Sequence, residues 1–75
     1  MNPISVGELV LYVSDALGVR VLGVVTAVIN SGEAHMGPYY RISWNHPSYY
    51  SMENTVYDME QTMLWRRCFI EFQST

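Results

Sequence analysis

The residues of this sequence that could do chemistry are few, and they form no reactive pattern. Cys68 is the single cysteine, and His35 and His46 are the two histidines. Nucleophilic catalysis by a cysteine requires a base such as histidine within hydrogen-bond reach. However, Cys68 lies within an alternating apolar run, where a buried and inert thiol is the usual finding. We therefore expect no catalytic residue and no enzymatic activity.

Metal and phosphate binding are no better supported. A zinc site needs three or four converging ligands, and His35, His46 and Cys68 show no ligand spacing such as C-x-x-C or H-x-x-x-H. The glycines are isolated from one another, so the chain has no glycine-rich phosphate loop. We expect no metal and no cofactor.

Tyrosine and tryptophan are better candidates for binding. Six Tyr and two Trp are hard to bury completely in a 75-residue chain, and both residue types suit interfaces because they join a large apolar face to a polar tip. Tyr49 and Tyr50 follow Pro47 in a predicted loop. Tyr39 precedes Tyr40 in a predicted strand, so the two side chains are expected on opposite faces. The sequence leaves open whether these tyrosines form a contact surface or are half-buried residues without a partner.

Two adjacent arginines add a second type of binding group. Arg66 and Arg67 could hold a phosphate or a carboxylate, although a solvated pair that interacts with Glu60 or Glu71 is the expected state of the free protein. The candidate partner-binding residues are Tyr39, Tyr49, Tyr50, Trp65, Arg66 and Arg67.

The charge of the chain argues against a broad nucleic-acid surface. Four Arg, no Lys and seven acidic residues give a net charge of −3, whereas phosphate-tracking surfaces rely on clustered cations. A single cysteine excludes an internal disulfide. The sequence begins without a recognisable signal peptide, and its longest nearly apolar run is too short to span a bilayer. We expect a cytoplasmic protein without membrane contact.

The elements that would position these residues are mostly short strands. Residues 6–13 alternate as a first strand with apolar residues on both faces, which suits a strand that is partly covered on its second side. Residues 19–30 are rich in β-branched residues and form the clearest strand. Gly23, within that strand, predicts a bulge or a sharp bend. Residues 39–44 form a third strand, and residues 54–57 a weaker fourth.

A helical turn is expected before the end of the chain. Asp58 can cap free N–H groups, and Gln61 can complete a capping box. We expect one short turn as far as about Leu64, followed by a last strand over residues 66–72. The predicted fold is all-β: one domain over residues 1–75, a five-stranded SH3-like barrel with a short helical turn before the last strand. Its predicted core comprises Leu9, Leu11, Val24, Val28, Ile42, Trp44 and Ile70.

Three segments carry a resemblance to a known group of proteins. They are Val6-Gly7-Glu8-Leu9-Val10, then Leu22-Gly23-Val24-Val25-Thr26, and then Tyr40-Arg41-Ile42-Ser43-Trp44. This series resembles small SH3-like barrel proteins of tailed bacteriophages, and the later Tyr57-Asp58-Met59-Glu60 is similar to their acidic turn. The resemblance implies the fold and a viral origin but no agreed function, and the loop over residues 45–54 departs from it.

Three functions are compatible with these observations. The first is a phage-encoded protein-interaction or assembly module that acts on a host protein or in a virion, and a homo-oligomer is compatible with it because a small core gains from additional buried area. The second is a nucleic-acid-binding SH3/KOW-like barrel that uses Arg41, Arg66 and Arg67, with bases stacking on Tyr39 or Tyr49; the charge of the chain disfavours it. The third is an aromatic-cage reader of a cationic side chain, built from Tyr39, Trp44, Tyr49 and Tyr57.

Overall fold

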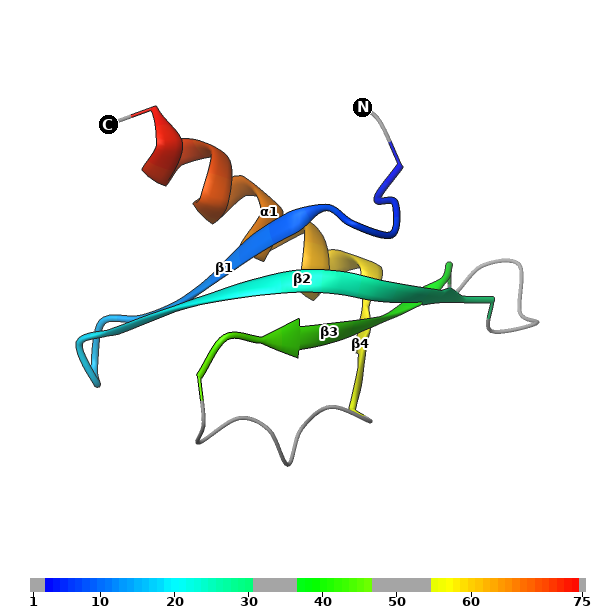
Figure 1. The fold of residues 1–75 in the computed structure, drawn as a ribbon, viewed down its shortest axis with the longest axis horizontal. Coiled ribbons are helices and arrows are strands. Elements are labelled where there is room, and N and C mark those ends of the chain that lie inside the picture. The colour runs from blue at the N-terminus through cyan, green and yellow to red at the C-terminus, as the bar shows by residue number, and fades with distance from the viewer. Residues whose placement is uncertain (1–2, 31–36, 47–54, 75) are drawn as a thin grey trace.

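The computed structural model describes residues 3–30, 37–46 and 55–74 of the 75-residue chain. These residues form a mostly β structure, a curled four-stranded antiparallel sheet with one C-terminal helix (Figure 1). The sheet order follows the chain. The elements are β1 (Leu9–Ser14), β2 (Val19–Ile29), β3 (Tyr39–Trp44), β4 (Val56–Asp58) and α1 (Met59–Gln73).

A tight turn joins β1 to β2. Gly18 adopts a left-handed conformation at φ +64°, which glycine reaches without a steric penalty. Its backbone N–H donates to the Asp15 carbonyl at 3.3 Å. The hairpin then pairs in continuous register from Ser14↔Val19 to Leu9↔Val24. The first strand therefore begins at Leu9, three residues later than the sequence pattern indicated.

The second strand contains a bulge close to Gly23. The register between β2 and β3 shifts between Val25 and Ala27, so Thr26 is the additional residue of a bulge. The Thr26 hydroxyl donates to the Arg41 carbonyl at 3.2 Å. Gly23 does not form the bulge itself. It lies against Trp44, where a Cβ would come within 2.6 Å of the ring. The bulge that the sequence placed at Gly23 is therefore at Thr26, and Gly23 instead permits a close approach of the backbone to Trp44.

The helix begins as the sequence predicts and then continues much further. The Asp58 carboxylate accepts a hydrogen bond from the Gln61 backbone N–H at 2.8 Å, which confirms the predicted N-cap. The predicted last strand over residues 66–72 is wrong, because α1 runs to Gln73. Once the cap has started a helix, Thr62, Trp65 and Phe69 repeat at helical spacing and turn towards the protein, whereas Ile70 is 53% exposed.

Helix α1 packs mainly along β1, with smaller contacts to β4 and β3. Strand β1 is an edge of the sheet, because β2 is the strand that pairs with it in the sheet order. Helix α1 therefore lies beside this edge (Figure 1). The structure described is thus a four-stranded half-barrel with a helix beside its first strand, and it contains no fifth strand within the described ranges. No helix in those ranges combines the length and apolar character that crossing a bilayer requires.

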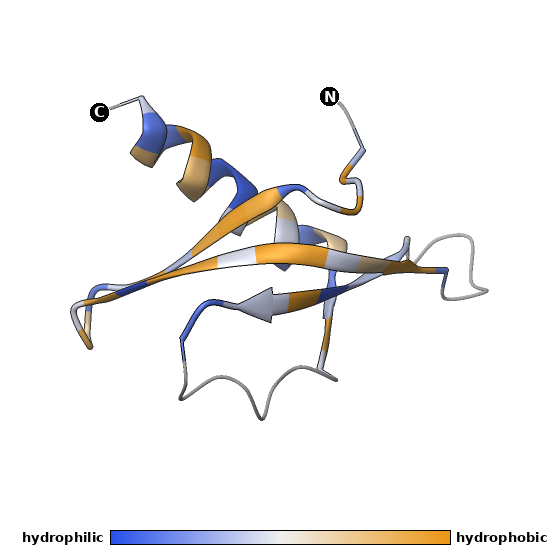
Figure 2. Cartoon of the chain, viewed as in Figure 1, coloured by the Kyte–Doolittle hydropathy of each residue, from blue (hydrophilic) through white to orange (hydrophobic). Residues whose placement is uncertain are grey.

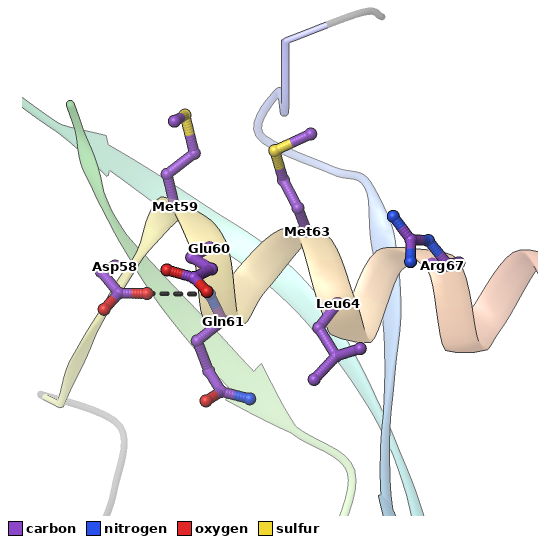
Figure 3. Close-up of a pocket in the computed structure, with 7 residues that line it drawn as sticks. All are labelled: Asp58, Met59, Glu60, Gln61, Met63, Leu64 and Arg67. Carbon is purple, nitrogen blue, oxygen red and sulfur yellow. Dashed lines mark hydrogen bonds between the residues drawn. The ribbon is translucent and has the colours of Figure 1, made fainter.

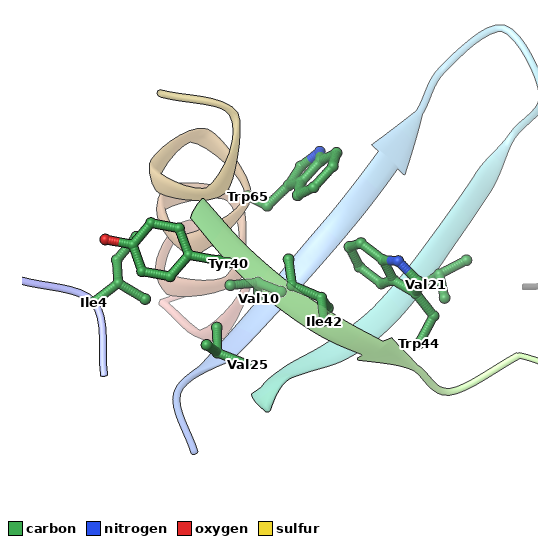
Figure 4. Packing of buried hydrophobic residues seen from close by; sticks show 8 residues of the cluster. All are labelled: Ile4, Val10, Val21, Val25, Tyr40, Ile42, Trp44 and Trp65. Atoms are coloured by element: carbon green, nitrogen blue, oxygen red, sulfur yellow. The ribbon is translucent and has the colours of Figure 1, made fainter. Parts of the chain in front are cut away.

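The hydrophobic core fills the space between the concave side of the sheet and α1 (Figure 4). Of the predicted core, Leu11, Ile42 and Trp44 are buried and Val24 is half-buried. Leu9, Val28 and Ile70 are exposed, so these three predictions are wrong. The core cluster comprises Ile4, Val10, Val21, Val25, Tyr40, Ile42, Trp44 and Trp65.

Aromatic rings organise one end of this core. The Trp65 ring lies edge-to-face against Trp44, Tyr57 and Tyr12, with centroid distances of 5.1, 4.9 and 5.9 Å. The Trp44 indole N–H donates to the Tyr57 hydroxyl at 3.2 Å. These contacts connect α1 to β1, β3 and β4, so one helical side chain joins three strands that lie apart in sequence.

Candidate functional site: the outer face of the sheet

The convex side of the sheet is the candidate site, and its members follow from the strand register. Directly opposed residues share a face of the sheet, and successive residues alternate between faces. Because Val10, Val21, Ile42 and Tyr40 point into the core, their neighbours along the strands point outward. We call this surface the outer face, and it comprises Leu9, Leu11, Val13, Arg20, Leu22, Val24, Ala27, Ile29, Tyr39, Arg41, Ser43, Val56 and Asp58.

The outer face is more apolar than the solvated side of an antiparallel sheet usually is. Such sheets commonly alternate apolar residues inward with polar residues outward. Here Leu22 and Val56 point outward and keep 38% and 43% of their surface exposed. Hydrophobic residues follow one another along β1 and along stretches of β2 (Figure 2). An exposed apolar surface of this kind marks an interaction site more often than chance would give.

Helix α1 accounts for part of this apolar character. Leu11 and Val13 line a hollow together with Cys68 and Phe72 of the helix, and Leu11 is buried. The Arg20 guanidinium lies 5.7 Å from the centre of the Phe72 ring, a cation–π contact. The end of the sheet near the β1–β2 turn is therefore covered by the helix. The exposure of Leu22 and Val56 shows that no described element covers the remaining outer face at those two residues.

Arg41 occupies the centre of the remaining outer face. Ala27 of β2 lies opposite Arg41 on one side and Val56 of β4 on the other. Tyr39 and Ser43, two residues away along β3, share its face. Arg41 is half-buried, and its Nε atom is buried without a hydrogen-bond partner. Within the described part of the chain the guanidinium also has no ion pair.

An arginine in this position is costly for the free protein. Removing a charged N–H group from water without giving it a partner costs about 1–3 kcal/mol or more. The neighbouring apolar side chains lower the local dielectric and strengthen the interaction of the guanidinium with any anion that approaches. The outer face therefore combines an apolar surface with a half-buried cation, Arg41, that has no counter-ion among the residues the structure describes.

The aromatic residues that the sequence proposed as partner contacts do not lie together on one surface. Tyr39 lies on the outer face, opposite Ile29 and Asp58, and is half-buried. Tyr49 and Tyr50 lie outside the described residues. Trp65 is 8% exposed and belongs to the core, so its assignment to a contact surface is wrong. Its ring turns inward because residue 65 lies on the buried side of a helix that the sequence pattern ended at residue 64.

The two adjacent arginines do not act as a pair. Arg66 is half-buried, and its Nε lies 2.9 Å from Oε1 of Glu8, whereas Glu60 and Glu71 were the expected partners. The other oxygen of Glu8 accepts a hydrogen bond from the Ser5 backbone N–H at 2.6 Å. Arg67 is exposed on α1. Successive residues of a helix point about 100° apart, so the two guanidinium groups do not converge on one ligand.

A second concave place lies over the first half of α1 (Figure 3). Met59 and Met63 project to the same side of the helix there, and Leu64 projects to a different side. Both signs of charge border this open hollow, from Glu60 and Arg67. Methionine adapts its shape to different neighbours, so the hollow suits a loose apolar contact better than a specific chemical reaction. Its lining residues are Asp58, Met59, Glu60, Gln61, Met63, Leu64 and Arg67.

The aromatic cage loses two of its proposed walls. Trp44 is buried, and Tyr57 packs edge-to-face against both Trp44 and Trp65. These two rings line the core and cannot also enclose a cationic side chain. Of the other two walls, Tyr39 lies on the opposite side of the sheet, and Tyr49 is outside the described residues. The cage is therefore not assembled as the sequence suggested.

Reactive groups remain scattered in the folded chain. Cys68 is half-buried on α1, and His46 is exposed after β3. Within the residues described, no three His, Cys, Asp or Glu side chains come together as metal ligands. Among the described residues, Tyr40 has a clearly shifted pKa: burial raises its pKa above 10.0, the nearby Glu8 carboxylate raises it further, and Arg66 opposes them. Tyr40 belongs to the core, so this shift concerns stability.

Sequence reasoning missed the outer face as a site, although a signal was present. The first strand is apolar on both of its faces, which indicates that the second face also meets something. The special environment of Arg41 depends on Ala27 and Val56, which are 14 and 15 residues away in the sequence. Comparison with models of protein families, with curated proteins and with solved structures found no match to this chain.

Proposed function

We propose that this protein is a non-enzymatic protein-interaction or assembly module that binds its partner with the outer face of its sheet. The observation that carries this proposal is the apolar outer face, on which Leu22 and Val56 are exposed and Arg41 is half-buried beside Val56. Burying exposed apolar area drives most protein–protein association. Tyr39 adds the kind of aromatic anchor that often dominates interface energies.

The finer parts of this proposal concern fold and origin. An SH3-like barrel has five strands, so we propose a variant in which α1, lying along β1, takes the structural place of the fifth strand. A viral origin, with a host protein or a virion component as partner in the host cytoplasm, rests on the sequence resemblance alone. A homo-oligomer that uses the same face is a form of the same proposal.

Nucleic-acid binding is the second candidate, and the arrangement of the arginines speaks against it. Binding to a phosphate backbone gains affinity from several cations along one surface. Here Arg66 is engaged with Glu8, Arg67 is on the helix surface, and Arg41 is surrounded by apolar residues. The overall charge of −3 adds long-range repulsion for a polyanion.

The proposal can be tested with two double variants, one on the outer face and one on α1 as a control. The first variant, Leu22→Thr with Val56→Thr, replaces apolar area of the outer face with hydroxyl groups and places a residue of high β propensity at each position. The control, Leu64→Gln with Ile70→Gln, removes comparable exposed area from α1 and keeps good helix formers. Each protein is immobilised and used to capture proteins from a bacterial lysate, with and without nuclease. Size-exclusion chromatography of each protein reports self-association.

The expected result is a captured protein, or a self-associated state, that survives nuclease and the control substitutions but is lost in the outer-face variant. Retention of binding in the outer-face variant would reject this face as the site. Loss of all capture after nuclease treatment would favour the nucleic-acid function instead.

A further inference from the structure

Among the described residues, Arg41 of the outer face has no counter-ion, and this points to the chemistry of a partner. The Nε atom of Arg41 is buried without a hydrogen bond, and no acidic side chain among the described residues pairs with its guanidinium. The nearest acid by register on this face, Asp58, uses Oδ1 to cap α1. Within residues 3–30, 37–46 and 55–74, no acidic side chain balances the charge of Arg41.

Carboxylate is the group that matches an arginine in such a setting. The planar guanidinium presents its N–H groups in a fork that fits the two oxygens of a carboxylate. The apolar residues on either side, Ala27 and Val56, would exclude water from the pair and strengthen it. The same residues would repel a carboxylate that remained strongly hydrated, so the acid must arrive with apolar neighbours of its own.

We propose that Arg41 determines the specificity of the outer face, and that the partner is a segment of another protein carrying an Asp or Glu side chain between apolar residues. This inference rests on the proposed function of the outer face. It adds the identity of the group that the face recognises: apolar contacts with Leu22, Val24 and Val56 provide area, and the carboxylate on Arg41 fixes the register.

A second copy of this chain is a poorer occupant of the same surface. In a two-fold contact the same patch meets itself, so a contact centred on Arg41 would place two guanidinium groups in one apolar interface. Burying like charges together costs free energy that the apolar contacts would have to offset. A partner that supplies the opposite charge avoids this cost.

The test is selection from a displayed library of random 12-residue peptides, followed by sequencing and by affinity measurement with synthetic peptides. The wild-type protein should enrich peptides that carry one Asp or Glu flanked by apolar residues. The variant Arg41→Glu should enrich peptides with Lys or Arg at that position. The variant Arg41→Met, which keeps the length and the apolar stem, should bind the wild-type peptides at least about tenfold more weakly.

A matched control separates a local effect from a general loss of positive charge. Arg67→Met removes an exposed arginine of α1 and should leave the selected peptides and their affinities unchanged. Circular dichroism and thermal unfolding verify that each variant is folded. If Arg41→Met does not fold, the composition of the peptides selected by the wild-type protein decides the question, with substitution of their acidic residue by Asn or Gln as the second measurement.

The outcomes distinguish the inference from the function on which it rests. If the wild-type protein selects peptides through the outer face without enriching an acid, the role of Arg41 is overturned and the docking surface remains. If selected peptides bind the Leu22→Thr/Val56→Thr variant as well as the wild type, the docking surface itself is wrong. Tighter binding of a labelled single-stranded oligonucleotide than of the peptides, with loss in Arg41→Met, would overturn the inference in favour of phosphate recognition.

Discussion

At Gly23 the core leaves no room for a side chain. A Cβ atom there would lie 2.6 Å from Cε3 of Trp44 and 2.7 Å from Cγ2 of Ile42. Both neighbours are buried, so neither can move without disturbing other contacts. The absence of a side chain at this position therefore sets how closely β2 and β3 pack around the indole ring.

We expect Gly23→Ala to destabilise the protein by about 1–3 kcal/mol through overpacking. Urea denaturation of the wild type and the variant measures this difference. In a Trp44→Phe background, where the ring is smaller, the same substitution should cost less, because the two residues are in contact and their effects are coupled. An equal cost in both backgrounds would show that the clash with Trp44 is not the cause.

Tyr40 should make stability depend on alkaline pH. Burial, together with Glu8, raises its pKa above 10.0 in the folded protein. The unfolded chain then loses the phenol proton first, so the stabilising effect is complete below about pH 10 and is lost as pH rises through the folded-state pKa. The free energy of unfolding, measured from about pH 9 to about pH 11, should fall less steeply in Tyr40→Phe than in the wild type. Parallel curves would contradict this assignment.

At the scale of elements, α1 is the feature that the sequence pattern described least well. Its start was predictable from Asp58 and Gln61, because a cap is a local interaction. Its length was not, because Cys68, Ile70 and Phe72 also alternate as a strand would. Short apolar runs fit both periods, and packing against β1 decides between them.

Neighbouring helix residues should therefore differ sharply in their effect on stability. Trp65→Ala should cost about 3–5 kcal/mol, because it removes a buried ring that contacts Tyr12, Trp44 and Tyr57. Leu64→Ala should change stability by about 0.5 kcal/mol or less, because Leu64 is 49% exposed. Chemical denaturation of both variants tests this contrast. Similar costs at the two positions would indicate that this segment is not the helix described.

At the scale of the whole molecule, the N-terminal segment closes one end of the core. Ile4 is buried in the core cluster, and Glu8 holds this segment by accepting from the Ser5 N–H while pairing with Arg66 of α1. The Gly7 N–H also donates to the Val25 carbonyl at 2.8 Å. Residues before the first strand thus join the sheet to the helix.

Removing the side chain of Ile4 should show this closure directly. We expect Ile4→Ala to cost about 2–5 kcal/mol, as large-to-small changes in a core do. Val6→Ala is the matched control, since Val6 is exposed and its loss should cost about 0.5 kcal/mol or less. Both are measured by urea denaturation, and a negligible cost for Ile4→Ala would show that the segment is not part of the folded core.

The sequence alone determined those features that depend on neighbouring residues. It located the central strands and the capped start of the helix, because β-branched content and an N-cap act over a few residues. It also placed Ile42 and Trp44 on the buried face of their strand. In the doubly apolar first strand the alternation was ambiguous, so Leu9 was assigned inward although Val10 and Tyr12 face the core.

The tertiary structure decided the features that depend on distant residues. Residues 66–72 are helical and not a strand because α1 packs on β1. The burial of Trp65 follows from that helix. The setting of Arg41 depends on Ala27 and Val56, which only the pairing of β2, β3 and β4 brings beside it. No local propensity encodes such a neighbourhood, because burial and the choice of cross-strand neighbours are properties of the assembled sheet.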